Sequence, residues 1–305
     1  MISAAAAGTW PLGDLVINRM GFGSMRLTQD GPAFAGDAAP SDRDRAITTL
    51  RRAVELGVNH IDTAAFYFSA LRSANELINT ALAPYPDDLV IVTKVGPGRD
   101  TWGNWTNAAR PDQLRGQVEE NLRQLGRDHL DVVNYRRQAS VQSISEHFGA
   151  LAELRDAGLI RHLGISGVEP AHLAEARAIA PVVCVQNAYS VSDRRPESSA
   201  LLQACGEQGI AFVPFFASAG TRRPGVAGGD GDAGSGGAAG PRLGDIARVH
   251  DATVAQIRLA WTLHQGRHVL AIPGTGNPDH VLENVAAGAI ELSDDELASL
   301  AVISR

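Results

Sequence analysis

The sequence predicts an α/β protein whose single domain, residues 1–305, forms a (β/α)8 TIM barrel. Eight short apolar runs alternate with amphipathic stretches of helical periodicity along the chain. Several runs lack the polar alternation of a half-exposed strand, as expected of parallel strands that are covered on both faces. A chain of 305 residues with 44% hydrophobic residues can bury one large core. Together these observations favour a closed parallel barrel.

The predicted strands are the eight apolar runs. In chain order they are residues 20–24, 58–63, 89–94, 130–135, 162–166, 182–186, 210–216 and 269–273. Before the first run, residues 10–19 carry Pro-Leu-Gly-Asp between two short apolar pieces. This arrangement predicts a β-hairpin in front of the barrel.

The predicted helices are marked by apolar side chains three and four residues apart. The pattern covers 42–56 and 112–126 and recurs at Leu151, Leu154 and Leu159. Gly126 is expected to end the second of these helices. S-x-x-E capping boxes are expected at two helix starts, Ser73 with Glu76 and Ser293 with Glu296.

The competing architecture is a doubly wound Rossmann sheet, which requires G-x-G-x-x-G after its first strand. Residues 21–26, Gly-Phe-Gly-Ser-Met-Arg, lack the third glycine. The barrel is therefore the better prediction.

Residues 225–240 break the alternation, because they hold eight glycines in 16 residues. Such a segment cannot bury a core, and we expect a mobile Gly-rich loop after strand 7. That position lies on the face where barrel active sites are found. The loop either orders over a ligand or is a tolerated surface insertion. Thr221, Arg222 and Arg223, which precede it, favour the first interpretation.

The composition excludes several classes of function. The net charge is −7 with both signs interspersed, and no basic stretch is interleaved with aromatic residues, so no nucleic-acid partner is expected. No apolar run approaches ~18 residues, so no membrane span is expected. The only cysteines, Cys184 and Cys205, are isolated, which fits neither a disulfide framework nor a metal site and indicates the cytoplasm. The oligomeric state stays open.

Lys94 is the only lysine among 27 lysine and arginine residues. It follows the apolar run 89–93, so it is expected at the C-terminal tip of a buried strand. Lysine and arginine are not interchangeable where a compact charge or a shiftable pKa is needed. Lys94 is therefore a candidate catalytic residue. The alternative is a chance remnant in the arginine-rich composition of a high-GC bacterium.

Three further side chains are expected beside Lys94, because the C-terminal strand ends of a barrel converge on one pocket. Asp62 and Arg136 stand at the ends of the second and fourth runs, and Tyr67 follows Asp62 by five residues. A nearby cation would stabilise the phenolate and lower the pKa of Tyr67, and a carboxylate would keep Lys94 charged. The set predicts a general acid that protonates a carbonyl oxygen during reduction by hydride. Individually, the same residues could instead pack or cap a helix.

The last predicted strand leads into the turn 273–277 and then into a helix that begins near Pro278. Exposed backbone N–H groups and the helix dipole favour anions at such a place, and barrels commonly bind phosphate there. The turn is a candidate phosphate site, the alternative being an ordinary Gly-rich turn.

The ordered motifs of the chain resemble the aldo-keto reductase superfamily. The matching segments are GFGSM (21–25), NHIDTAAFY (59–67), VTKVG (92–96), GISG (164–167), VQN (185–187) and IPGTGNPDHVLEN (272–284). The segments 56–63, LDVVN at 130–134 and FVPFF at 212–216 are most similar to the bacterial pyridoxal-reductase-like branch.

The resemblance implies a catalytic set of Asp, Tyr, Lys and His. Asp62, Tyr67 and Lys94 match, and the histidine position falls on Arg136. Arginine cannot give up a proton at neutral pH, so Tyr67 would be the only acid. Arg136 would stabilise developing negative charge or hold an anionic or phenolic substrate group.

The resemblance also implies a nicotinamide cofactor, NADPH by family expectation, with NADH not excluded. The implied cofactor-binding residues are Gly23, Ser24, Met25, Asp62, Ser166, Gln186, Phe215, Phe216, Ala217, Gly274, Thr275, Gly276, His280, Glu283 and Asn284. Gly167 stands where Asn is usual, which removes one amide contact. Residues 274–275 and His280 replace the usual Lys-Ser and Arg, so both cations for a 2′-phosphate are missing unless Arg222 or Arg223 compensates.

The sequence thus predicts NAD(P)H-dependent reduction of an aldehyde or ketone to an alcohol. By resemblance, pyridoxal is the first candidate substrate and a keto intermediate of secondary metabolism is the second. Two alternatives stay open. One is a catalytically weak cofactor-binding sensor or scaffold, and the other is a lyase or isomerase that uses no nicotinamide.

Overall fold

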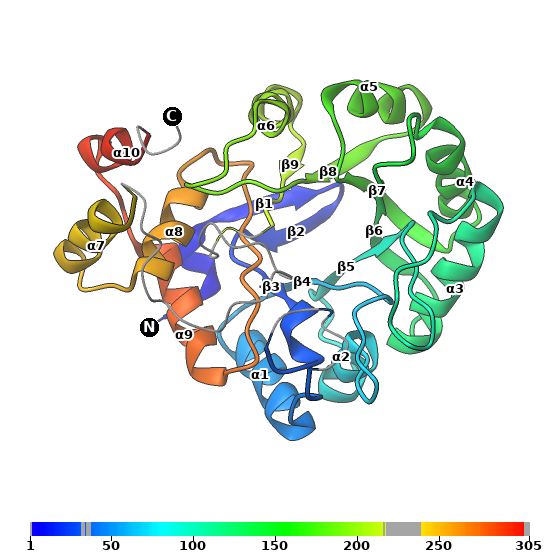
Figure 1. Ribbon diagram of the computed structural model, residues 1–305, viewed down its shortest axis with the longest axis horizontal. Helices are drawn as coiled ribbons and strands as arrows, with labels where there is room; N and C mark the ends of the chain where they lie inside the picture. Colours follow the sequence, from blue (N-terminus) through cyan, green and yellow to red (C-terminus); the bar gives the residue numbers. More distant parts are fainter. Residues whose placement is uncertain (1, 32–33, 35–37, 216, 218–238, 302–305) are drawn as a thin grey trace.

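The computed structural model of the chain describes residues 2–31, 34, 38–215, 217 and 239–301. At its centre lies a seven-stranded parallel sheet in the order β3-β4-β5-β6-β7-β8-β9. The strands are β3 Phe22–Gly23, β4 His60–Asp62, β5 Val90–Val95, β6 Leu130–Arg136, β7 Ile160–Ser166, β8 Val182–Gln186 and β9 Ala211–Phe212. Helices lie around the outside of the curled sheet (Figure 1). This arrangement confirms the predicted α/β barrel.

The eighth predicted strand, residues 269–273, closes the sheet without forming a regular strand. Single parallel bridges join Phe212 to Val269 and Met20 to Ala271. The segment therefore contacts both edges of the sheet. It ends at a proline, which has no amide hydrogen with which to continue a ladder.

The helices begin and end close to the predicted signals. The α-helices of the described residues are α1 Arg43–Glu55, α2 Ala74–Leu82, α3 Leu114–Leu125, α4 Ser145–Asp156, α5 Pro170–Ile179, α6 Pro196–Gln208, α7 Ala239–Val249, α8 Val254–Leu263, α9 Pro278–Ala286 and α10 Asp294–Ala301. Gly126 ends α3 in the left-handed conformation at φ 63°, as predicted. Leu159 is not part of α4, because the chain turns at Gly158, where φ is 81°.

One of the two predicted capping boxes is complete. At α10 the Ser293 hydroxyl accepts the Glu296 amide at 3.4 Å, and the Glu296 carboxylate accepts the Ser293 amide at 2.8 Å. At α2 the Ser73 hydroxyl accepts the Glu76 amide at 3.4 Å. The Glu76 carboxylate lies instead 3.9 Å from Arg123 of α3. The box at α2 is therefore half formed, because a charge on the neighbouring helix competes for the carboxylate.

The predicted hairpin is present as two antiparallel strands, β1 Thr9–Leu12 and β2 Leu15–Asn18. Leu12 and Ile17 are fully buried in the same cluster as strand residues such as Val132. The turn residue Asp14 lies 2.6 Å from His162, near the start of β7. The hairpin therefore plugs the N-terminal end of the barrel and leaves the C-terminal strand ends for a site.

The predicted Gly-rich loop, residues 225–240, falls almost entirely outside the described residues. Its last two positions, Ala239 and Gly240, already belong to α7. The predicted loop therefore ends two residues too late, because helix α7 begins at Ala239 and includes Gly240.

The described part of the chain has no helix that is long and apolar enough to cross a membrane. It contains no group of three His, Cys, Asp or Glu side chains placed to hold a metal ion. Cys184 and Cys205 are both buried free thiols.

Candidate active site

A buried ion pair joins the C-terminal ends of β4 and β5. The Lys94 ammonium donates to both carboxylate oxygens of Asp62, at 2.6 and 2.8 Å, and to the Thr63 carbonyl at 3.0 Å. Both charged side chains are 5% exposed. Burial by itself would lower the pKa of Lys94, but the interactions of its ammonium with Asp62 and Tyr67 outweigh burial, and the net pKa is raised. Lys94 is therefore an ammonium at neutral pH.

Tyr67 lies in the loop after β4 and is 9% exposed. The Lys94 ammonium lies 4.9 Å from the centroid of its ring. Burial raises the pKa of Tyr67, and the Lys94 charge opposes this by a smaller amount. The net lowering of this pKa that the sequence suggested is wrong, because the phenol loses more solvation than Lys94 compensates. Tyr67 keeps its proton throughout the neutral range.

Arg136 is the last residue of β6 and lines the same cavity as Tyr67. Its Nη1 donates to Ser166 Oγ at 3.1 Å, and its guanidinium carbon lies 4.8 Å from the centroid of the Phe215 ring. Burial lowers the pKa of Arg136. A guanidinium nevertheless stays charged at neutral pH, so this side chain contributes a positive charge and N–H donors.

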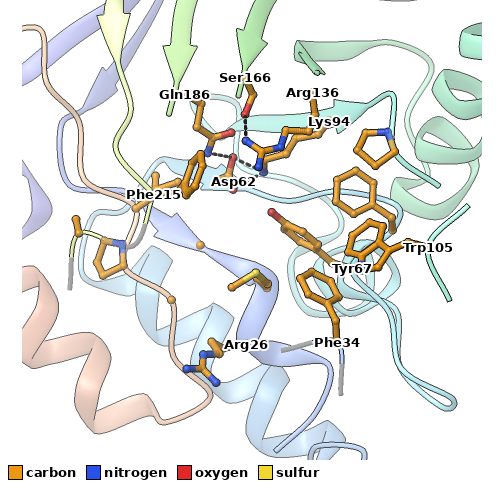
Figure 2. A pocket seen from close by; sticks show the side chains of 18 residues that line it. Arg26, Phe34, Asp62, Tyr67, Lys94, Trp105, Arg136, Ser166, Gln186 and Phe215 are labelled. Carbon is orange, nitrogen blue, oxygen red and sulfur yellow. Dashed lines mark hydrogen bonds and ion pairs between the residues drawn. The ribbon is translucent and has the colours of Figure 1, made fainter. Parts of the chain in front are cut away.

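The four predicted catalytic side chains meet at one cavity of about 420 Å³ (Figure 2). The predicted cofactor residues that line it are Gly23, Met25, Asp62, Ser166, Gln186, Phe215, Ala217 and Gly274. Seven further lining residues are not among the predicted site residues: Arg26, Phe34, Phe66, Pro97, Trp105, Ile272 and Pro273.

Three of the additional residues form an aromatic wall, defined as Phe34, Phe66 and Trp105. The ring of Trp105 lies 5.1 Å from that of Phe34 and 5.8 Å from that of Phe66, measured between centroids. Phe34 also lies 5.9 Å from Tyr67. The wall comes from three separate loops without periodicity, so only the occurrence of aromatic residues after predicted strand ends could have indicated it. It suits a planar, apolar ligand beside Tyr67.

None of the other predicted cofactor residues in the described part of the chain lines the cavity. Ser24 is fully buried, and its hydroxyl donates to Thr63 Oγ1 at 2.9 Å. Those that follow Gly274 along the turn and α9 are Thr275, Gly276, His280, Glu283 and Asn284, of which His280 and Glu283 are exposed. Phe216, Arg222 and Arg223 lie outside the described residues. The roles of these residues stay predictions.

Pro273 and Gly274, at the start of the turn 273–277 that leads into helix α9, line the far end of the cavity. The side chain of Asn277 caps α9 by accepting the Asp279 amide at 3.2 Å. Arg26 lines the cavity close to this turn, 3.8 Å from where a Cβ on Gly274 would stand. Figure 2 shows Arg26 well away from Ser166. Arg26 thus places a positive charge at this end of the cavity, which favours an anionic part of a bound molecule there.

Comparison with known proteins identifies the family. Residues 19–305 match the model of the aldo/keto reductase family. This chain belongs to the aldo/keto reductase family. It is 41% identical to pyridoxine 4-dehydrogenase of Escherichia coli strain K12, over 98% of this chain and 99% of that protein. This relative agrees with the branch expected from the sequence.

Solved structures of aldo/keto reductases have the same fold. A thermostable aldo-keto reductase solved with the inhibitor epalrestat is 29% identical, with a TM-score of 0.78 over 97% of this chain and 99% of that one. An aldo/keto reductase of Klebsiella pneumoniae, solved with NADP and acetate, is 25% identical, with a TM-score of 0.71 over 93% of this chain and 90% of that one. As a member of this family, the chain is an NAD(P)H-dependent oxidoreductase acting on carbonyl groups.

Proposed function

We propose that this aldo/keto reductase reduces an aldehyde to an alcohol, with pyridoxal as the first candidate substrate. The observation that carries the proposal is the protonated Tyr67 phenol beside the Lys94–Asp62 ion pair, in a cavity with an aromatic wall. The name of the E. coli relative supports this substrate, because pyridoxine and pyridoxal are the alcohol and aldehyde of one pyridine ring. The aromatic wall suits such a ring.

In this proposal the acid chemistry is divided among three side chains. When bound, a reduced nicotinamide supplies the hydride for the carbonyl carbon. Tyr67 hydrogen-bonds the carbonyl oxygen and gives it a proton as negative charge develops. Lys94 stabilises the phenolate that remains on Tyr67, and Asp62 holds the ammonium in place. Arg136 cannot supply the proton, since its guanidinium does not titrate near neutral pH.

NADPH is the proposed cofactor. Ser166 and Gln186 offer hydrogen bonds and Phe215 offers a ring face at one end of the cavity, which fits a nicotinamide. Arg26 and the turn 273–277 fit the phosphates at the other end. NADP in the K. pneumoniae structure supports this choice. NADH is the competing dinucleotide, because the turn itself carries no fixed positive charge.

Tyr67→Phe tests the proposal, because it removes the acidic hydroxyl and keeps the ring. We expect kcat for pyridoxal reduction, followed by NADPH absorbance, to fall about 10³-fold, within the range for loss of a general acid. NADPH affinity, followed by quenching of tryptophan fluorescence, should stay near that of the unchanged protein, since the ring remains.

Three outcomes would contradict the proposal. A substantial residual rate in Tyr67→Phe would mean that another group is the acid. Tight NADPH binding by the unchanged protein, without reduction of any aldehyde in a panel that includes pyridoxal, would favour a sensor or scaffold. A lack of fluorescence quenching by either dinucleotide would favour a lyase or isomerase.

A further inference from the structure

Arg136 and Gly167 share one space in the site. A Cβ atom added to Gly167 would lie 2.8 Å from Arg136 Nη1, 3.1 Å from its Cζ and 3.2 Å from the Arg137 carbonyl oxygen, so the guanidinium would have to move. The guanidinium therefore fills the room that a side chain at position 167 would need. The backbone of Gly167 is left-handed at φ 67°, a conformation that asparagine tolerates better than other side chains.

The Arg136 guanidinium lacks a carboxylate partner of its own. None of the ion pairs in the described part of the chain includes Arg136, and Asp62 is taken by Lys94 and by the Gln186 side-chain amide at 3.0 Å. One of its five N–H donors reaches Ser166. Arg136 is part-buried and lines the cavity, so its remaining N–H donors are within reach of a bound molecule. An acceptor on a bound molecule would pair with them.

The groups around the guanidinium match a primary amide on a planar ring. The Ser166 oxygen accepts from Arg136, which leaves the hydroxyl proton for a second acceptor. Gln186 Oε1 accepts a long 3.4 Å bond from Asn134 and keeps a lone pair. Two donors for one carbonyl oxygen and one acceptor for an NH₂ group thus stand beside the ring face of Phe215.

We propose that Arg136 is a cofactor-binding residue that donates to the carboxamide oxygen of the nicotinamide, and that Gly167 is glycine because this guanidinium occupies its side-chain space. The two departures from the family pattern, at 136 and 167, are then one coupled change. The inference rests on dinucleotide binding as in the proposed function, and it assigns Arg136 to the cofactor instead of the substrate.

Arg136→Met is the first test, because it removes the donors and the charge while keeping an unbranched side chain. The probes are NADPH and its thionicotinamide analogue, whose sulfur is a weaker acceptor than the amide oxygen. Dissociation constants come from tryptophan fluorescence. We expect the NADPH constant to rise about tenfold or more, the amount for one hydrogen bond to a charged group. The preference for NADPH over the thio analogue should shrink.

A fragment that lacks the nicotinamide, 2′,5′-ADP, provides the control. Its affinity should be the same in Arg136→Met and in the unchanged protein, since the phosphate end of the site is untouched. An equal loss for this fragment would point to general misfolding of the site and would overturn the specific role of Arg136.

Reciprocal variants test the pairing. Gly167→Asn alone should weaken NADPH binding, because its side chain displaces the guanidinium. The double variant Arg136→His with Gly167→Asn should recover affinity, because the shorter imidazole frees the space and the asparagine amide supplies a donor. If the losses of NADPH affinity caused by the two single changes simply added in the double variant, the pairing would be refuted, since residues in contact give non-additive effects.

The failure of this inference is distinguishable from failure of the proposed function. Unchanged NADPH affinity in Arg136→Met, with a raised KM for pyridoxal, would assign Arg136 to the substrate and leave the reductase proposal standing. If the unchanged protein bound neither NADPH nor the analogue, both proposals would fall together.

Discussion

At the scale of single residues, the contacts of Lys94 favour an ammonium at this one position in an arginine-rich chain. Its nitrogen lies within 3.0 Å of two Asp62 oxygens and the Thr63 carbonyl, and 4.9 Å from the Tyr67 ring centroid. One compact charge can satisfy all these groups at a buried strand end. The planar fork of a guanidinium is larger and requires a different arrangement of acceptors.

Lys94→Arg should therefore lower kcat for aldehyde reduction by about a hundredfold, the lower end of the range for general-acid catalysis. The physical reason is that the guanidinium cannot take the place of the ammonium between Asp62 and Tyr67. Initial rates of NADPH oxidation measure the effect, with NADPH affinity as the control. Near-normal turnover would mean that Lys94 is a chance remnant and not a catalytic residue.

Tyr67 determines the expected pH dependence of the reduction. Burial raises its pKa above the ordinary value of about 10, so the acid form predominates throughout the neutral range. In the proposed function the rate requires the protonated phenol, so it should be flat from neutral pH and fall only above about pH 10. A kcat profile for pyridoxal measures this, with unfolding at each pH monitored by circular dichroism. A fall centred near neutral pH would mean that another group titrates.

At the scale of helices and strands, a buried polar network fixes the strand ends that carry the site. Asn121 of α3 accepts the Asn75 side-chain amide of α2 at 2.9 Å and the Thr93 hydroxyl of β5 at 2.5 Å. The Thr63 hydroxyl, next to Asp62, donates to Asn75 at 2.7 Å. All four side chains are fully buried. Two helices outside the barrel thus hold the segments that present Asp62 and Lys94.

Asn121→Ala should lower the free energy of unfolding by about 2–4 kcal/mol, because the Asn75 amide and the Thr93 hydroxyl lose their shared buried acceptor. Urea unfolding followed by circular dichroism measures the change. Glu119→Ala on the same helix is the matched control, because its side chain is 56% exposed and its ion pair lies on the surface. That control should change stability by less than about 0.5 kcal/mol. Equal effects of the two variants would contradict the role of the network.

At the scale of the whole molecule, the hairpin and the candidate active site lie at opposite ends of the barrel. The hairpin β1–β2 fills the N-terminal end with Leu12 and Ile17, whereas the ion pair and the cavity lie at the C-terminal strand ends. Changes at the plugged end should therefore alter stability without altering the reaction.

Leu12→Ala should cost about 2–5 kcal/mol of unfolding free energy, the range for a fully buried leucine. Val16→Ala, on the same hairpin, is the control, because Val16 is 62% exposed. Thermal and urea unfolding measure both variants, and kcat at 25 °C should stay near that of the unchanged protein in each. A large loss of kcat in still-folded Leu12→Ala would contradict the separation of the two ends.

Much of the site could be predicted from the sequence because strand ends are locally encoded. The apolar runs that end near Asp62, Lys94 and Arg136 place these residues at one edge of a parallel barrel, and the structure brings them together with Tyr67. The aromatic wall was not predicted, because Phe34 and Trp105 lie in separate loops without periodicity and meet only in the folded structure.

By itself the sequence determined the barrel, the hairpin and the family, because hydrophobic periodicity and short motifs are local properties of the chain. The tertiary structure alone decided the direction of the Tyr67 pKa shift, since this depends on how burial compares with the Lys94 charge. It also decided that Arg136 occupies the space beside Gly167. These outcomes depend on distances between segments far apart in the chain, which no local pattern encodes.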